Sequence, residues 1–337
     1  MKRSLLLLLC LVLVCAFTVG CSSPAPAETG EGTGETEEAA TVDFPTKVVR
    51  VICPYAAGGG SDTLARALAE AAGKYLPGGY GIVVENVAGG SGVVGATELL
   101  GQQPDGYNLM QFVNGVLTFQ PHLGKATYTI EDFESVAGLF AVPNVFVVPA
   151  DSPFNSFEEV IEYCKENPGK FNYGSPGTGT FAQVAAAAVI AKAGIEMTHV
   201  PFDGSANTHT ALLGKHVDGA AYLATDCKQY VDSGDFKVLW TTAATDMYPD
   251  APTTADLGID YDLVAWTGLV GPAGMDEEVV QILSDAYRQA LEDPATVELF
   301  SNMGYTGSYA DPTEYEKILL DEFAANAETL KTIGLAQ

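Results

Sequence analysis

Two short glycine-rich segments of this sequence have the residue types that bind anions through the main chain. Each of them, residues 56–61 and residues 175–179, follows an apolar run and precedes a helical pattern. Such a turn leaves main-chain N–H groups free at the start of a helix, where the helix dipole also favours negative charge. One such turn alone is more often a geometric necessity. Two at matching places predict a site for an anion that needs neither Arg nor Lys.

Other patterns that could carry chemistry are weaker. Gly90, Gly92 and Gly95 have the spacing of a dinucleotide-binding turn, but the acidic residue expected near Phe112 is absent. The sequence has no G-x-S-x-G nucleophile turn, so an exported hydrolase of α/β fold is kept only as the alternative function. The four histidines show no metal-ligand spacing. We therefore expect no catalytic residue, no metal and no cofactor.

Alternating strand and helix patterns position the two turns. Strands are predicted at residues 48–53, 82–84, 107–112, 146–148, 172–174, 199–202, 219–223 and 237–241. Helices are predicted at residues 62–75, 93–101, 156–167, 181–193, 279–291, 295–303 and 313–332. This alternation predicts two α/β units with mainly parallel sheets. Proteins with such sheets bind their ligands at the carboxyl ends of the strands, and both turns lie there.

The first part of the chain has the features of an export signal followed by a tether. Lys2 and Arg3 precede an apolar run, residues 5–17, that is too short for a membrane span. Cys21, shortly after this run, resembles the lipidated cysteine of a bacterial lipobox, although Thr18 stands where Leu is usual. An ordinary signal peptide cleaved elsewhere is the alternative. We expect residues 1–20 to be the signal peptide and residues 21–43 to be a disordered acidic tether.

Composition limits the partners of the protein. The 43 acidic and 16 basic residues give a net charge of -27, so we expect no binding to nucleic acid. Beyond Cys21, three cysteines remain: Cys53, Cys164 and Cys227. Their odd number and the lack of a C-x-x-C spacing predict buried thiols.

The ordered segments of the chain resemble the extracytoplasmic solute receptors of tripartite tricarboxylate transporters, the Bug or TctC-type receptors. The resemblance covers nearly all of residues 48–335. The segments that carry it are 54–62 (PYAAGGGSD), 84–92 (VENVAGGSG), 104–107 (PDGY), 173–179 (YGSPGTG), 199–201 (HVP), 212–218 (LLGKHVD), 252–253 (PT), 266–269 (WTGL) and 271–274 (GPAG).

The resemblance implies a type II periplasmic-binding-protein fold, or Venus flytrap, with two α/β lobes joined by crossing strands. Lobe 1 would comprise residues 44–143 and 265–337, and lobe 2 would comprise residues 144–264. The implied protein is no enzyme but a monomeric, lipid-anchored receptor, at the outer face of the cell membrane or in the periplasm. It would deliver a small organic carboxylate (a di- or tricarboxylate or an amino acid) to a two-subunit membrane permease.

By the same resemblance, the ligand is held largely by the main chain of the two turns. The implied ligand-binding residues are Tyr55, Ala57, Gly58, Gly60, Ser61, Asp62, Asn114, Ser175, Gly177, Thr178, Gly179, Thr180, Phe202 and Asp203. Asp62 could also cap the first helix, and Trp266 and Tyr222 could pack in the hinge or line the cleft.

The sequence departs from the family pattern near the second turn. Gln183 stands nearest to a usual His, and Phe202-Asp203-Gly204 replaces the usual Tyr-Lys-Gly. The ligand's identity therefore stays open, and Asp203 could recognise an amine.

Overall fold

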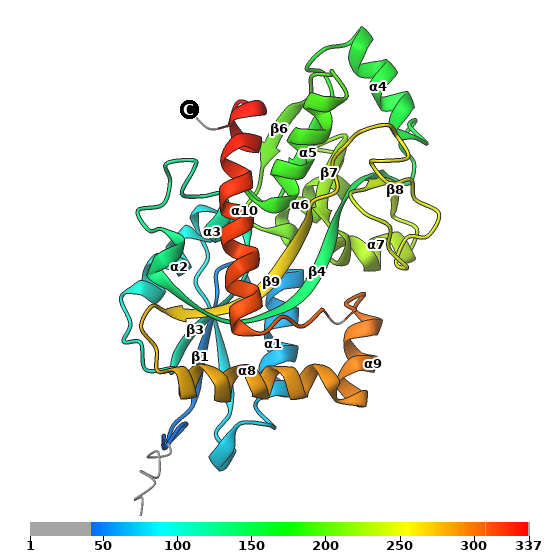
Figure 1. The fold of residues 1–337 in the computed structure, drawn as a ribbon. Coiled ribbons are helices and arrows are strands. Elements are labelled where there is room, and N and C mark those ends of the chain that lie inside the picture. Colours follow the sequence, from blue (N-terminus) through cyan, green and yellow to red (C-terminus); the bar gives the residue numbers. More distant parts are fainter. Residues whose placement is uncertain (1–41, 307, 336–337) are drawn as a thin grey trace, which may run out of the picture. The chain divides into compact units, whose positions relative to one another are not determined.

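A computed structural model describes residues 42–306 and 308–335 of the protein (Figure 1). The predicted signal peptide, the predicted lipid site at Cys21 and most of the predicted tether lie outside these residues. The described part belongs to one compact unit. Within it, no helix is both long enough and apolar enough to cross a membrane.

The first strands form a parallel group with a helix after each of two strands. Its elements are β1 (Val49–Cys53), α1 (Gly60–Ala72), β2 (Ile82–Asn86), α2 (Val93–Leu100) and β3 (Asn108–Val113). Strand β1 lies between β2 and β3 and is parallel to both. Helix α1 packs through Leu64, Leu68 and Ala72, which recur at the spacing of one helix face and are fully buried. The predicted elements of this region are confirmed to within a few residues.

The second group repeats this arrangement. Its elements are α4 (Phe157–Glu166), β5 (Asn172–Ser175), α5 (Phe181–Lys192), β6 (Thr198–Pro201), α6 (Ser205–Leu213) and β7 (Gly219–Leu223). Strand β5 lies between β6 and β7 and is parallel to both. The sequence did not predict α6, whose first turns contain Ser, Asn and Thr residues of modest helix propensity. The short helices α3 (Gly115–Thr118) and α7 (Lys228–Asp232) were also not predicted.

Two long strands join the groups. Strand β4 (Phe133–Pro149) has 17 residues, whereas the sequence predicted only residues 146–148. Its residues 133–143 pair with β9 (Val264–Pro272), and its residues 144–149 pair with β7 and β8 (Phe236–Thr241), all antiparallel. A single nine-stranded sheet results, in which β9 also pairs with β3. The partners of β4 change between Pro143 and Asn144, where the crossing between lobes was expected. The lobe boundaries themselves stay a prediction.

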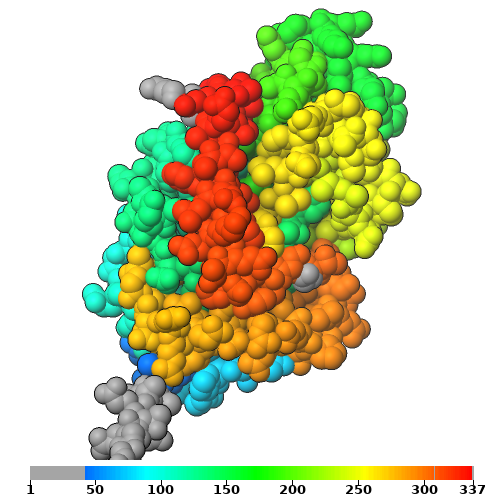
Figure 2. Space-filling view, in the orientation of Figure 1, coloured from blue at the N-terminus to red at the C-terminus, as the bar shows by residue number. Residues whose placement is uncertain are grey.

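Three helices complete the chain: α8 (Glu277–Glu292), α9 (Pro294–Asn302) and α10 (Pro312–Thr332). Each begins at an aspartate whose side chain accepts main-chain N–H groups of the first turn, a strong helix start signal. Helix α10 lies along the surface in Figure 2 and contacts both β4 and α3.

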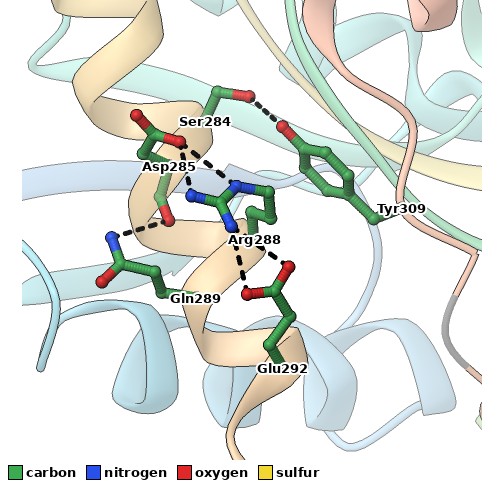
Figure 3. Close-up of polar contacts among 6 residues, drawn as sticks. All are labelled: Ser284, Asp285, Arg288, Gln289, Glu292 and Tyr309. Atoms are coloured by element: carbon green, nitrogen blue, oxygen red, sulfur yellow. Dashed lines mark hydrogen bonds and ion pairs between the residues drawn. The ribbon is translucent and has the colours of Figure 1, made fainter.

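Polar contacts on α8 are shown in Figure 3. Arg288 binds Asp285 and Glu292, and the Ser284 hydroxyl contacts the Tyr309 hydroxyl at 2.9 Å. This last contact ties α8 to the segment that precedes α10.

The predicted α/β class is confirmed, and so is the prediction for the cysteines. Cys53, Cys164 and Cys227 are free and buried. Burial raises the pKa of all three thiols, which makes them unreactive core residues.

Candidate functional site

A cleft that is partly open to solvent lies between the two strand groups, with about 610 Å³ of empty space when the adjoining open solvent is included. Its walls come from the carboxyl ends of several strands and from the starts of the helices that follow them. The first group contributes Tyr55, Ala56, Gly59, Gly60, Ser61, Ser91, Val113, Gly115 and Val116. The second contributes Pro176, Thr180, Phe181, Ala182, Gly204, Ser205, Ala206, Leu223 and Asp226. Both glycine-rich turns therefore face the same space.

Three helices begin at this cleft. The first residues of α1, α5 and α6 all belong to its wall. The first N–H groups of a helix have no acceptor within the helix. Among the described residues, the N–H groups of Ser61, Ala182 and Ala206 indeed find no acceptor elsewhere. The cleft thus offers convergent main-chain donors with the positive end of a helix dipole behind each of them.

Asp62 stabilises the first glycine-rich turn, residues 56–61. Its carboxylate accepts the Gly58 N–H at 2.9 Å and the Asn86 side-chain amide at 2.8 Å, and it pairs with Arg66. Burial opposes the charge, but these contacts outweigh it and lower the pKa of Asp62. Asp62 does not line the cleft, and the suggested N-cap role is wrong, because Gly59 holds that position. Its carboxylate instead fixes the turn whose end lines the cleft.

The second turn is closed by its own side chains. Ser175 is fully buried, and its hydroxyl lies 2.7 Å from His199 Nε2 and 3.1 Å from the Gly177 carbonyl. Burial lowers the pKa of His199 to about 4, so the imidazole is neutral at neutral pH. Gln183, at the place of the usual His, accepts the Gly179 N–H at 3.0 Å. These residues shape the turn and do not line the cleft.

Side chains of the first group hold the second turn across the cleft. Ser91 donates its hydroxyl to the Thr178 carbonyl at 2.9 Å, and Gln120 donates to the Gly179 carbonyl at 2.7 Å. Gly177 is required by this close approach, because an added Cβ would lie 2.6 Å from the Ser91 hydroxyl and its φ is +151°. These contacts join the two sides of the cleft.

Only part of the predicted ligand-binding set lines the cleft. Tyr55, Gly60, Ser61 and Thr180 do so. Lying outside the lining are Ala57, Gly58, Asp62, Asn114, Ser175, Gly177, Thr178, Gly179, Phe202 and Asp203. Trp266 and Tyr222 also lie outside it. Asp203 is exposed to solvent and is not part of the lining, and its suggested binding of an amine stays a prediction.

Asn114 has a different setting from the one its sequence context suggested. Its side chain is fully buried, accepts the Trp266 N–H at 3.1 Å and donates to Glu322 of α10. Burial raises the pKa of Glu322 to about 8. These contacts link the end of β3 to β9 and α10, so we assign Asn114 a role in joining those elements.

Sequence reasoning missed Asp226, the only charged side chain among the described residues that line the cleft. It lies in the 3-10 turn Ala224–Cys227, directly after β7. Its Oδ2 accepts the Ser205 hydroxyl at 2.6 Å, and burial raises its pKa to about 6. The signal that could have revealed it is positional, because an acidic residue at the carboxyl end of a parallel strand faces the site.

Comparison with known proteins decides the family. Residues 64–335 match the family described as "Tripartite tricarboxylate transporter family receptor". The chain belongs to this family. Over 297 residues, it is 32% identical to the UPF0065 protein in the gbd 5' region of Cupriavidus necator, covering 87% of this chain and 90% of that one.

Solved structures of similar proteins share the fold. The periplasmic binding protein BugD is 28% identical, with a TM-score of 0.81 over 87% of this chain and 99% of that one. MatC from Rhodopseudomonas palustris, solved with bound malate, is 25% identical, with a TM-score of 0.79 over 85% of this chain and 100% of that one. These findings confirm the predicted family and the periplasmic-binding-protein fold. The receptor is a solute-binding protein and not an enzyme.

Proposed function

We propose that this receptor is a lipid-anchored extracytoplasmic protein that binds a small carboxylate-bearing solute in the cleft and delivers it to a membrane permease. The observation that carries the proposal is the convergence of three helix N-termini on one cleft. Malate in the MatC structure supports a carboxylate as the ligand class. The ligand-binding role extends to the predicted site residues that line the cleft.

The proposed grip uses donors from both halves. A carboxylate in the cleft accepts the Ser61 N–H from α1 and the Ala182 N–H from α5, and it finds both together only when the halves are close. The ligand therefore favours the closed arrangement. Exclusion of water strengthens each amide-to-carboxylate hydrogen bond, because the local dielectric constant falls.

The proposed cellular arrangement is based on the first 43 residues of the sequence. Residues 1–20 direct export, Cys21 carries the lipid, and residues 21–43 tether the folded part to the membrane surface. The folded part is a monomer that a permease of two subunits recognises. Replacement of Cys21 by Ala should release the protein from the membrane fraction, and retention of that variant at the membrane would refute the anchor.

A substitution that removes one main-chain donor tests the grip. Ser61→Pro deletes the Ser61 N–H, and Pro is tolerated here because Ser61 lies in the first turn of α1 and follows a glycine. Ser61→Ala keeps the N–H and serves as the matched control. We expect Ser61→Pro to weaken binding of the best acid by about 10-fold or more, the effect of one hydrogen bond to a charged group.

The measurement is isothermal titration with a panel of mono-, di- and tricarboxylates, after a thermal-shift screen has found the best ligand. Circular dichroism confirms that both variants are folded. Equal affinities of Ser61→Pro and Ser61→Ala would show that the ligand does not use this donor. A panel in which no acid raises the melting temperature would refute a carboxylate ligand.

A further inference from the structure

The carboxylate of Asp226 is unusual in a cleft built for anions. Among the described residues, Asp226 Oδ1 has no hydrogen-bond partner and is shielded from solvent. It lies so close to the start of α1 that a Cβ added to Gly60 would be 2.1 Å from it. A buried carboxylate oxygen without a partner is costly. A ligand donor that fills this position would remove the cost.

No cation of the described chain fills this position. Lys228, two residues further on, pairs with Asp232 at 2.6 Å. The ionisable groups that interact electrostatically with Asp226 are Tyr55, Tyr222, Cys227, Tyr248 and Tyr305. Burial raises the pKa of each of them, so all are neutral at neutral pH. No cationic side chain among the described residues therefore pairs with Asp226, and the position beside Oδ1 is free for a donor from a ligand.

Ser205 fixes the orientation of this carboxylate. Its hydroxyl holds Oδ2 at 2.6 Å, which leaves Oδ1 as the free acceptor. Ser205 is the first residue of α6 and, like Asp226, belongs to the wall of the cleft. The carboxylate is thus held in place at one side of a cleft whose other walls present main-chain donors.

We propose that Asp226 binds the ammonium group of a zwitterionic ligand, so that the receptor selects an amino acid over the corresponding acid without the amino group. The inference rests on the proposed carboxylate grip, which holds the other end of the same ligand. The main-chain donors of α1 and α5 bind the ligand carboxylate, and Asp226 Oδ1 accepts a hydrogen bond from the ammonium group.

The test compares acids that differ by one amino group. Isothermal titration at pH 7.5 uses three matched pairs: L-alanine and propionate, L-aspartate and succinate, and L-glutamate and glutarate. The wild type should bind the amino acid of at least one pair 10-fold or more tighter than its partner, as a charge-assisted hydrogen bond predicts. Asp226→Asn should reduce that ratio to about 3-fold or less and leave binding of the partner acid unchanged or tighter.

Matched variants separate this effect from loss of the grip or of the fold. Asp203→Asn removes an exposed carboxylate outside the cleft and should keep the wild-type ratio. Asp226→Ser, which has a smaller neutral side chain, is the second variant and should also lose the preference. Ser61→Pro should weaken both members of a pair alike, because it acts on the shared carboxylate.

Three results would overturn the inference. In the first, the acid without the amino group binds as tightly as its amino acid, or more tightly, in every pair. In the second, the wild-type preference for the amino acid survives in both Asp226 variants. In the third, none of the six compounds binds. In each case the carboxylate grip is judged separately by the Ser61 variants on the broader panel of acids.

Discussion

Replacement of Asp226 by Asn should change how the stability of the ligand-free protein depends on pH. Burial raises the pKa of Asp226 to about 6, against an ordinary value of 3.8. The folded state therefore holds this proton more tightly than the unfolded state does. The stability that the proton contributes is fully present below pH 3.8 and is lost as the pH rises through 6.

The size of the effect follows from the two pKa values. Over the whole interval the shift corresponds to about 3 kcal/mol, at 1.36 kcal/mol per unit. Between pH 8 and pH 5 only part of it is recovered. Proton linkage gives about 1.4 kcal/mol, which the wild type gains and Asp226→Asn does not. The unfolding free energy of Asp226→Asn minus that of the wild type should therefore fall by about 1.4 kcal/mol when the pH is lowered from 8 to 5.

Urea unfolding of both proteins at pH 8 and pH 5 measures this double difference, in which contributions of all other groups cancel. The lower limit of pH 5 avoids protonation of the buried His209, whose pKa burial lowers to about 4. Asp203→Asn, which removes an exposed carboxylate, is the control for the loss of one negative charge. A double difference near zero, or an advantage that grows as the pH falls, would refute the buried, unpaired carboxylate.

Three further predictions concern the turns and the elements behind them. Gln120→Ala removes the donor to the second turn and should weaken ligand binding about 3- to 10-fold in titrations, the worth of one hydrogen bond; unchanged affinity would argue against a closing contact. Gly177→Ala should abolish ligand binding while circular dichroism shows a folded protein, because the added Cβ would meet the Ser91 hydroxyl. Gly81→Ala, whose added Cβ meets open space, is the control and should bind normally. Normal binding by both variants would show that the close approach at Gly177 is not needed for binding. Burial raises the pKa of Glu322 from 4.5 to about 8, so the wild type should lose stability relative to Glu322→Gln as the pH rises from 5 to 8.5; a constant difference in urea unfolding would contradict this.

The sequence predicted the fold well wherever the signal was local. Apolar periodicity located α1 and α8, and the strand-to-helix turns at residues 56–61 and 175–179 were found from their glycines. Strand β4 was underestimated because Gly138, Pro143 and Asn144 interrupt its apolar pattern. Its length is set by pairing with strands distant in the chain, which local propensity does not encode.

The site was predicted in position but not in detail. The prediction that the two glycine-rich turns lie at the site followed from topology, because both turns follow the carboxyl ends of parallel strands. Which residues reach the cleft depends on side-chain direction, and Ser175 and Asp62 turn inward to brace the turns. Asp226 carries no motif, and its role emerges only because Ser205 and Gly60, distant in sequence, lie beside it.

The continuity of β4 bears on how the receptor opens. A strand that pairs with β9 at one end and with β7 and β8 at the other cannot act as a slack linker. Any rotation of one half against the other must twist hydrogen-bonded strands, and the register shifts at Gly138 and Phe146 are where extra twist is most easily absorbed. We therefore expect an elastic torsion with a preferred resting angle, so that stiffness in these strands sets how long a captured solute is retained.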